Sequence, residues 1–217
     1  MTRLDRQRQA IAILLAALAG YVDAIAFIES GGYFVSFMSG NSTRLGVAIA
    51  SGQIVGTVAL LIGSFVCGVA GATVLGRHRP GRRKRVMLLV AALLAAAAGS
   101  IGFVPPPVSL ALAAAAMGAE NAVFADDGDA LGLTYMTGAL VKIGQRLADA
   151  MTGGPRFDWL PFLLLWAGLI AGGIAGGLSY GGMGLTALWA AAIVALLATP
   201  FVGEAGSRPS PDSPRPL

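Results

Sequence analysis

Two acidic side chains stand inside apolar stretches of the sequence, Asp23 in GYVDAIAF and Glu120 in MGAENAVF. At the centre of a bilayer a carboxylate costs about 2.5–3.5 kcal/mol on insertion scales, so such residues usually face a bundle interior and mark a path for ions, protons or solutes. Both could bind a proton or a cation. Structural alternatives stay open for both. Asp23 could hydrogen-bond to Ser36, Asn41 or Asn121, and Glu120 could snorkel toward the membrane surface or be neutralised by protonation.

A segment rich in glycine and hydroxyl groups follows each acid, GYFVSFMSGNSTRLG at 32–46 and LGLTYMTGALVKIG at 131–144. Glycine interrupts a helix and hydroxyls satisfy the freed backbone groups. Irregular backbone at membrane depth is tolerated only inside protein or beside water. We expect Ser39, Asn41 and Ser42 to cap the helix that follows. With Asp23, Glu120 and Asn121, the candidate residues of a solute or proton site are Ser36, Ser39, Gly40, Asn41, Thr134, Thr137 and Gly138.

A basic side chain stands one turn beyond the glycine of each segment, Arg44 in the first and Lys142 in the second. These side chains could attract an anionic group or anchor to lipid phosphates, and both interpretations stay open. The acids of DDGD at 126–129 could bind a hard cation through oxygen or simply end a helix. With one histidine and one cysteine in the chain, the sequence predicts no metal site and no cofactor.

The elements that must position these residues are transmembrane helices. Of the 217 residues, 56% are hydrophobic and 12% are charged, and the mean hydropathy is +0.74. These values are typical of a multi-span membrane protein and not of a soluble or nucleic-acid-binding domain. A crossing helix needs about 20 mostly apolar residues. The sequence therefore predicts an all-α membrane protein with about six spans, at 10–29, 54–76, 86–104, 107–126, 158–178 and 183–202.

The basic residues predict the orientation of these spans. Positively charged loops face the cytoplasm, and the run GRHRPGRRKR at 76–85 and the arginines of residues 1–9 satisfy this rule with six crossings. Both termini are then cytoplasmic, and the Pro/Ser-rich tail at 203–217 is expected to be disordered. Full crossings by 33–52 and 131–150 would place the basic run outside. We therefore expect a broken or re-entrant segment after the first span of each half.

An internal repeat divides the chain into two three-helix units, 10–104 and 105–202. Shifting the sequence by 98 positions places residues 20–46 on residues 118–144 without a gap. Asp23 then meets Asn121, and GVAGA at 68–72 meets GIAGG at 173–177. Because each unit has an odd number of spans, the second enters the membrane from the opposite side, as in inverted-repeat transporters. Small residues at four-residue spacing should let helices approach closely, and these residues are Ser64, Gly68, Ala72, Gly172 and Gly176.

The motifs GYVDAIAF, FVSFMSGN and TYMTGAL resemble the YoaK-like family of bacterial multi-span membrane proteins (domain of unknown function 1275). The resemblance covers residues 8–202 and implies a place in the inner membrane, but it names no activity. Two positions depart from the expected pattern. Ser39 stands where threonine is usual, and Glu120 stands where an amide is typical. The added charge at Glu120 puts any shared ligand preference in doubt.

These observations predict an inner-membrane transporter or permease for an unknown small solute, with its site between the inverted repeats near mid-membrane. Asp23 or Glu120 could couple transport to protons. One alternative is a non-transporting membrane subunit that assembles with a partner. A third possibility, a membrane-embedded enzyme, has only scattered carboxylates to support it, so we expect no enzymatic activity. The lipid bilayer is the expected environment, and the small number of helices favours a homodimer.

Overall fold

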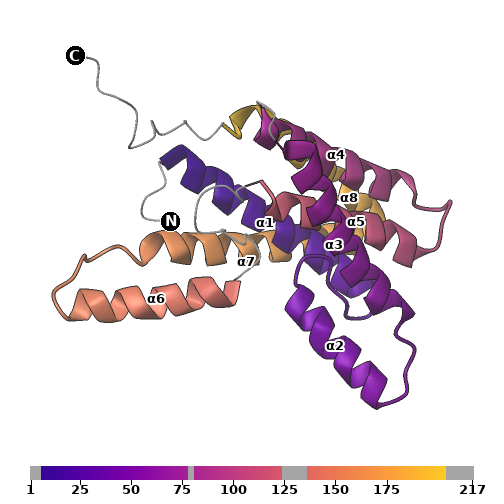
Figure 1. The fold of residues 1–217 in the computed structure, drawn as a ribbon, viewed down its shortest axis with the longest axis horizontal. Coiled ribbons are helices and arrows are strands. Elements are labelled where there is room, and N and C mark those ends of the chain that lie inside the picture. Colours follow the sequence, from indigo (N-terminus) through magenta and orange to yellow (C-terminus); the bar gives the residue numbers. More distant parts are fainter. Residues whose placement is uncertain (1–5, 78–80, 124–135, 204–217) are drawn as a thin grey trace.

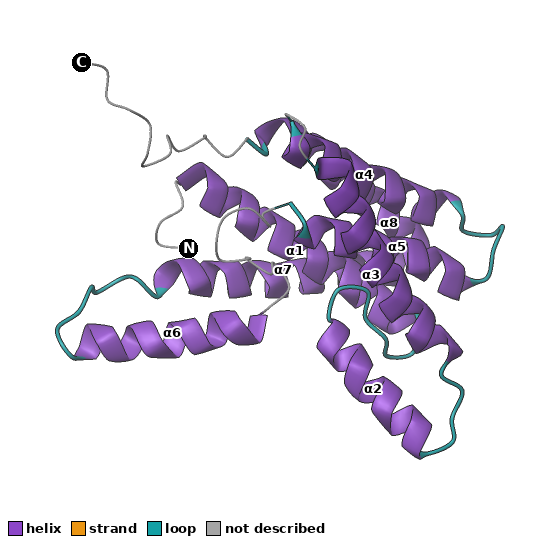
Figure 2. Cartoon of the chain, in the orientation of Figure 1, coloured by secondary structure: helices purple, strands orange, loops and turns teal. Residues whose placement is uncertain are grey.

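The computed structural model describes residues 6–77, 81–123 and 136–203. Within these ranges the chain is helical, and its one β-type contact is an isolated bridge between Ile101 and Val104 (Figure 2). The all-α prediction is confirmed. The helices shown in Figure 1 are α1 (Arg6–Glu29), α2 (Met38–Ala50), α3 (Gly56–Gly76), α4 (Arg82–Gly99), α5 (Pro106–Asn121), α6 (Met136–Met151), α7 (Leu160–Met183) and α8 (Leu188–Ala198).

Three segments of the described chain are long and apolar enough to cross a bilayer, Arg6–Glu29, Gly56–Gly76 and Leu160–Phe201. The third contains α7, the short 3₁₀ helix Gly184–Ala187 and α8. Gly184 has a φ of 57°, a left-handed conformation that glycine adopts without strain. α7 therefore ends at this position, and α8 begins in a new direction. These three apolar segments indicate that the chain is a membrane protein.

The helices that match the predicted third and fourth spans end earlier than expected. The predicted span 86–104 corresponds to α4, which ends at Gly99, and the predicted span 107–126 corresponds to α5, which ends at Asn121. Gly102 at a φ of 86° turns the chain after α4. Pro106 then occupies the first turn of α5, where a missing backbone N–H costs nothing. Turn chemistry thus overrides the continuing apolar composition.

Two helix pairs that are distant in sequence form the body of the molecule, α1 with α7 and α3 with α5. A Cβ atom added to Gly172 would lie 1.8 Å from the carbonyl oxygen of Ala17. One added to Gly68 would lie 2.0 Å from the carbonyl oxygen of Ala115. Only glycine allows backbones to approach so closely, and close packing is a main source of helix association in lipid. The packing role predicted for these glycines is confirmed.

The close contacts of the two pairs correspond to one another. A Cβ added to Gly20 would lie 2.1 Å from the carbonyl oxygen of Leu169, and one added to Gly118 would lie 2.1 Å from that of Phe65. Gly118 follows Gly20 by 98 positions, the spacing of the sequence repeat. The first helix of each half, α1 or α5, therefore packs in the same way against a helix of the other half, α7 or α3.

The correspondence between α3 and α7 differs by one residue from the sequence alignment. Matching GVAGA with GIAGG pairs Gly68 with Gly173. In the structure Gly172 makes the contact equivalent to that of Gly68, whereas a Cβ on Gly173 would have its nearest neighbour at 3.7 Å. Neighbouring glycines make such an alignment ambiguous in sequence, and the backbone contacts decide it.

α2 and α6 lie at the edge of the molecule, beside α3 and α7 respectively (Figure 1). The predicted break after the first span is confirmed in the first half, because α1 ends at Glu29 and α2 begins at Met38. α2 has 13 residues, so it is about 20 Å long, shorter than the roughly 30 Å of hydrocarbon in a bilayer. α6 buries only Ala139 and carries the charged side chains Lys142, Arg146 and Asp149.

Candidate functional site

Asp23 fastens the loop that joins α1 to α2. Its Oδ1 accepts hydrogen bonds from the backbone N–H groups of Val35, at 2.8 Å, and Ser36, at 2.7 Å. The Ser36 hydroxyl donates a short hydrogen bond to Oδ2. Ser36 is buried, and Asp23 retains 9% of its exposure. Of the three partners predicted for Asp23, the structure shows Ser36. The carboxylate therefore satisfies loop backbone groups that apolar surroundings would otherwise leave unpaired.

Asn41 holds the same loop from the α2 side. Its Nδ2 donates to the carbonyl oxygen of Phe34 at 2.6 Å, and its Oδ1 accepts from the N–H of Phe34 at 3.0 Å. The predicted helix cap is wrong, since α2 begins after Phe37 without a side-chain capping bond. The amide is used to pair the loop backbone. Ser42 donates to the carbonyl oxygen of Met38, and Ser39 is exposed.

Asn41→Ala is expected to lower the free energy of unfolding by about 1–3 kcal/mol, because both backbone groups of Phe34 lose their partner in a part-buried place. Ser42→Ala is the control, since Ser42 is exposed and bonds only within α2. It should change the unfolding free energy by less than about 0.5 kcal/mol. Thermal unfolding of the purified protein in detergent measures both. Equal melting temperatures for the two variants would show that Asn41 does not stabilise the loop.

A cavity of about 670 Å³ lies between α1, the loop 30–37, the start of α6 and α7. Its polar lining side chains are Asp23, Ser36 and Thr137, three of the residues predicted for the site. Thr137 is contributed by the second half of the chain, so the cavity joins both halves. Its volume is within the range of small-molecule sites, about 300–1,000 Å³. The remaining wall is apolar and includes three phenylalanines, Phe27, Phe34 and Phe37.

The three phenylalanines form one connected cluster. The ring centroids of Phe27 and Phe34 lie 5.0 Å apart, and those of Phe34 and Phe37 lie 5.3 Å apart with the rings nearly perpendicular. These are favourable separations for aromatic pairs. The sequence pattern does not predict these rings as part of the site. The i, i+3 spacing of Phe34 and Phe37 is visible in the sequence, but Phe27 joins them only through the turn of the loop.

Glu120 lies in the buried interior of the bundle. It is 0% exposed, and neither of its carboxylate oxygens has a hydrogen-bond partner among the described residues. α5 brings it near enough to Asp23 for their charges to interact. Its counterpart in the repeat, Val22, is also fully buried. The structure thus places an acid where the other half has an apolar side chain. Neither hydrogen bonding nor solvation within the described chain explains this acid.

The other predicted site residues that the structure describes lie outside the cavity wall. Asn121 is half-buried, and its amide donates to the carbonyl oxygen of Met117 in the same helix. Gly40 faces the ring of Phe37, while Gly138 has open space around it. Thr134 and the acids of 126–129 lie outside the described residues.

Arg44 and Lys142 have different surroundings. The Arg44 guanidinium lies 5.8 Å from the ring centroid of Phe27 and 5.6 Å from that of Tyr33, within cation–π range. Its position beside Gly32 leaves no room there for a larger side chain. Lys142 is exposed on α6. Anion binding and lipid anchoring both stay predictions for this pair, and aromatic packing is an added role for Arg44.

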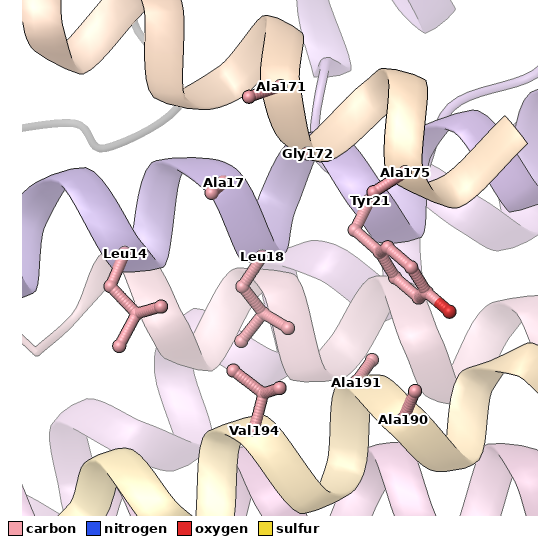
Figure 3. Close-up of a pocket in the computed structure, with 10 residues that line it drawn as sticks. All are labelled: Leu14, Ala17, Leu18, Tyr21, Ala171, Gly172, Ala175, Ala190, Ala191 and Val194. Carbon is pink, nitrogen blue, oxygen red and sulfur yellow. The ribbon is translucent and has the colours of Figure 1, made fainter. Parts of the chain in front are cut away.

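A second cavity, of about 320 Å³, lies between α1, α7 and α8 (Figure 3). Leu14 and Leu18 of α1 point into it toward Val194 of α8. Its polar group is the Tyr21 hydroxyl, which already donates to the carbonyl oxygen of Ala187 at 3.1 Å. Such a wall offers apolar contact without a free polar group to orient a ligand. The cavity beside Asp23 is therefore the better candidate for a solute site.

The described residues contain no group of three side chains suited to hold a metal ion. The arrangement beside Asp23 can bind a molecule through one carboxylate, two hydroxyls and an aromatic wall. The Ser36 hydroxyl is paired with the Asp23 carboxylate in this wall, and the same carboxylate accepts two N–H groups of the loop. Binding is the chemistry that this geometry supports.

The comparisons with known proteins agree with a membrane location. Residues 11–200 match the family described as "Protein of unknown function (DUF1275)". The chain is 39% identical over 204 residues to a UPF0700 transmembrane protein of Rhizobium meliloti (strain 1021), covering 90% of this chain and 88% of that protein. No solved structure matches the chain. The family match and this similarity together show that the chain belongs to the DUF1275 family of transmembrane proteins.

Proposed function

We propose that the protein is a small-solute transporter or permease of the bacterial inner membrane, built from two inverted three-helix repeats. The observation that carries the proposal is the matched packing of Gly68 on Ala115 and Gly172 on Ala17. In both contacts a helix of one half packs against a helix of the other half, α3 against α5 and α7 against α1. Inverted repeats that pack in this way place a solute site near mid-membrane at their interface.

The direction of the paired helices supports six crossings. Ala17 faces Gly172 and Tyr21 faces Gly176, so α1 and α7 run in the same direction. Spans one and five of a six-span chain have this relation, and so do spans one and seven of an eight-span chain, so the number of crossings depends on α2 and α6. The exposed charges of α6 and the shortness of α2 favour peripheral or re-entrant positions for these helices. Both termini are then cytoplasmic, as the basic loop 76–85 favours.

The proposed solute site is the cavity beside Asp23, with Ser36 and Thr137 as further polar contacts. Glu120 is the proposed proton-coupling group, because a buried acid without a hydrogen-bond partner in the described chain is stable only when neutral. A homodimer is part of the proposal, since six helices leave little protein around this cavity. The protein acts as a carrier or channel and not as an enzyme.

Cysteine accessibility tests the inverted arrangement. In a Cys67→Ala background, single cysteines replace Gln53 before α3 and Thr152 before α7, both exposed positions. A membrane-impermeant thiol reagent is expected to label the cysteine at 53 in intact cells, and the one at 152 only after the cells are opened. Labelling of both from the same side would contradict the inverted repeat. A non-transporting partner subunit would then be the better interpretation.

Reconstitution tests transport itself. Protein in liposomes that contain a pH-sensitive dye is exposed to a panel of small solutes at constant external pH. A coupled solute is expected to change the internal pH in wild-type vesicles and not in empty vesicles or vesicles with Glu120→Gln. Uptake of a solute without a pH change would overturn the proton coupling and leave the transport function in place.

A further inference from the structure

The described charged side chains that line the cavity beside Asp23 are of one sign. Among its described lining residues there is one acidic side chain, Asp23, and no basic one. Arg44 belongs to the same region but is stacked on Phe27 and Tyr33, and it is not part of the wall. Within the described part of the wall, a solute therefore meets one ionisable group, and that group can carry only negative charge.

The apolar surroundings make this charge selective. Bringing a neutral molecule against a carboxylate removes water from it without supplying a counter-charge, which is costly. An anion would add repulsion. A cation within about 4–6 Å favours the ionised carboxylate and offsets the desolvation of both charges. Asp23 accepts its present hydrogen bonds from loop donors and needs no rearrangement of that loop to face a cation.

The aromatic cluster favours the same class of solute. Phe27, Phe34 and Phe37 line the cavity together with Asp23, and aromatic faces attract ammonium groups within about 6 Å. The guanidinium of Arg44 at 5.8 Å from Phe27 shows that one of these rings already contacts a cation. The other lining residues, among them Ile28, Leu140 and Leu169, would contact an apolar body.

We propose that the cavity binds hydrophobic organic cations, that is, amines with a compact apolar or aromatic body. The ammonium group pairs with Asp23 and lies against the phenylalanine rings, and the body fills the apolar remainder of the 670 Å³ cavity. The inference rests on the proposed function, because it names the substrate class of the same site.

Three probes of nearly equal shape test the proposal, 4-phenylbutylamine, 4-phenylbutan-1-ol and 4-phenylbutyrate. They differ in charge at one end, positive, neutral and negative. Calorimetric titration of the purified full-length protein in detergent is expected to show the amine binding at least about tenfold more tightly than the alcohol, because the charge pair forms in a poorly hydrated place. The butyrate is expected to bind most weakly.

Asp23→Asn removes the negative charge of the site while it keeps hydrogen-bonding groups for the loop. The asparagine Oδ1 can accept from the N–H groups of Val35 and Ser36, and its amide can donate to the Ser36 hydroxyl, so the fold should be kept. This variant is expected to bind the amine and the alcohol equally. Glu29→Gln is the matched control, since Glu29 is a carboxylate near the end of α1 that accepts from Tyr180 and does not line the cavity. It should retain the wild-type preference.

Phe34→Leu tests the aromatic part and does not depend on the folding of Asp23→Asn. Leucine keeps an apolar wall but removes the central ring, so the amine-to-alcohol ratio should fall at least about threefold. Equal binding of amine and alcohol to wild type would overturn the proposal. Tighter binding of butyrate would also overturn it and would assign anion recognition to Arg44.

The binding experiment tests the substrate class, and the transport experiment tests the transporter proposal, so a negative result in one does not contradict the other. Asp23-dependent amine binding without uptake of labelled 4-phenylbutylamine into liposomes would support the ligand class and overturn transport of this probe. Uptake of other solutes by a protein that shows no amine preference would leave the transporter proposal in place and overturn the substrate class.

Discussion

Gly172→Ala is expected to lower the free energy of unfolding by about 3 kcal/mol or more, an effect at the upper end for overpacking. The new methyl carbon would lie 1.8 Å from the carbonyl oxygen of Ala17. The obstacle is helix backbone, which cannot rotate away as a side chain could. α1 and α7 would have to separate along their contact. Thermal unfolding in detergent and the yield of monodisperse protein measure the loss.

Two other helical glycines provide controls for Gly172. Gly71 in α3 and Gly182 in α7 have no neighbouring atom within 4 Å of an added Cβ. Alanine at either position should leave stability unchanged or raise it by about 0.5–1 kcal/mol, because alanine is the better helix former. If the melting temperature of Gly172→Ala equalled that of these controls, α1 and α7 would not pack as closely as the structure places them.

The same substitution at Gly68 tests whether the two halves are equivalent. Its added Cβ would meet the carbonyl oxygen of Ala115 at 2.0 Å, against 1.8 Å for Gly172 and Ala17. The two variants should therefore lose similar stability, and the double variant should not give a stable protein. A loss at only one of the two positions would show that the matched contacts do not contribute equally, and it would weaken the case for a duplicated architecture.

The sequence predicted a correspondence between the two halves, but it did not predict which helices pack together across them. In-register matches between polar residues, such as Asp23 with Asn121, identified the repeat without any structure. A one-residue error remained between α3 and α7, because glycines at both 172 and 173 fit the pattern. Contact with a specific carbonyl oxygen distinguishes them, and such a contact depends on a helix from the other half of the chain.

The site shows a similar limit. Hydrophobic burial indicated that Asp23 must have a polar partner, and Ser36 was one of three candidates. The choice depended on the path of residues 30–37, where Gly31 and Gly32 have positive φ values. The side-chain type of Asn41 predicts a helix cap, yet Asn41 pairs with the backbone of Phe34. Side-chain types indicate which bonds are needed, and the loop geometry decides which groups form them.

Glu120→Met is expected to raise the free energy of unfolding by about 1–3 kcal/mol, because it removes a desolvated polar group and keeps a side chain of similar size. Both Glu120 oxygens lack a hydrogen-bond partner in the described chain, and the residue is fully buried. The same variant should lose any solute-driven pH change in liposomes. A gain of stability with a loss of function is the expected signature of a group kept for its activity. Thermal unfolding and the liposome assay, performed on one preparation, measure both effects.

Asp23→Met is the matched comparison and should have the opposite effect on stability. It removes the acceptor for the N–H groups of Val35 and Ser36 and for the Ser36 hydroxyl, so the loop is left with unpaired polar groups. The two acids belong to the same bundle interior and differ mainly in whether donors surround them. A loss of stability in Glu120→Met as large as that in Asp23→Met would mean that Glu120 also has partners in the membrane. The acid would then hold the helices together, and proton coupling would have to be assigned to Asp23 or to no residue of this site.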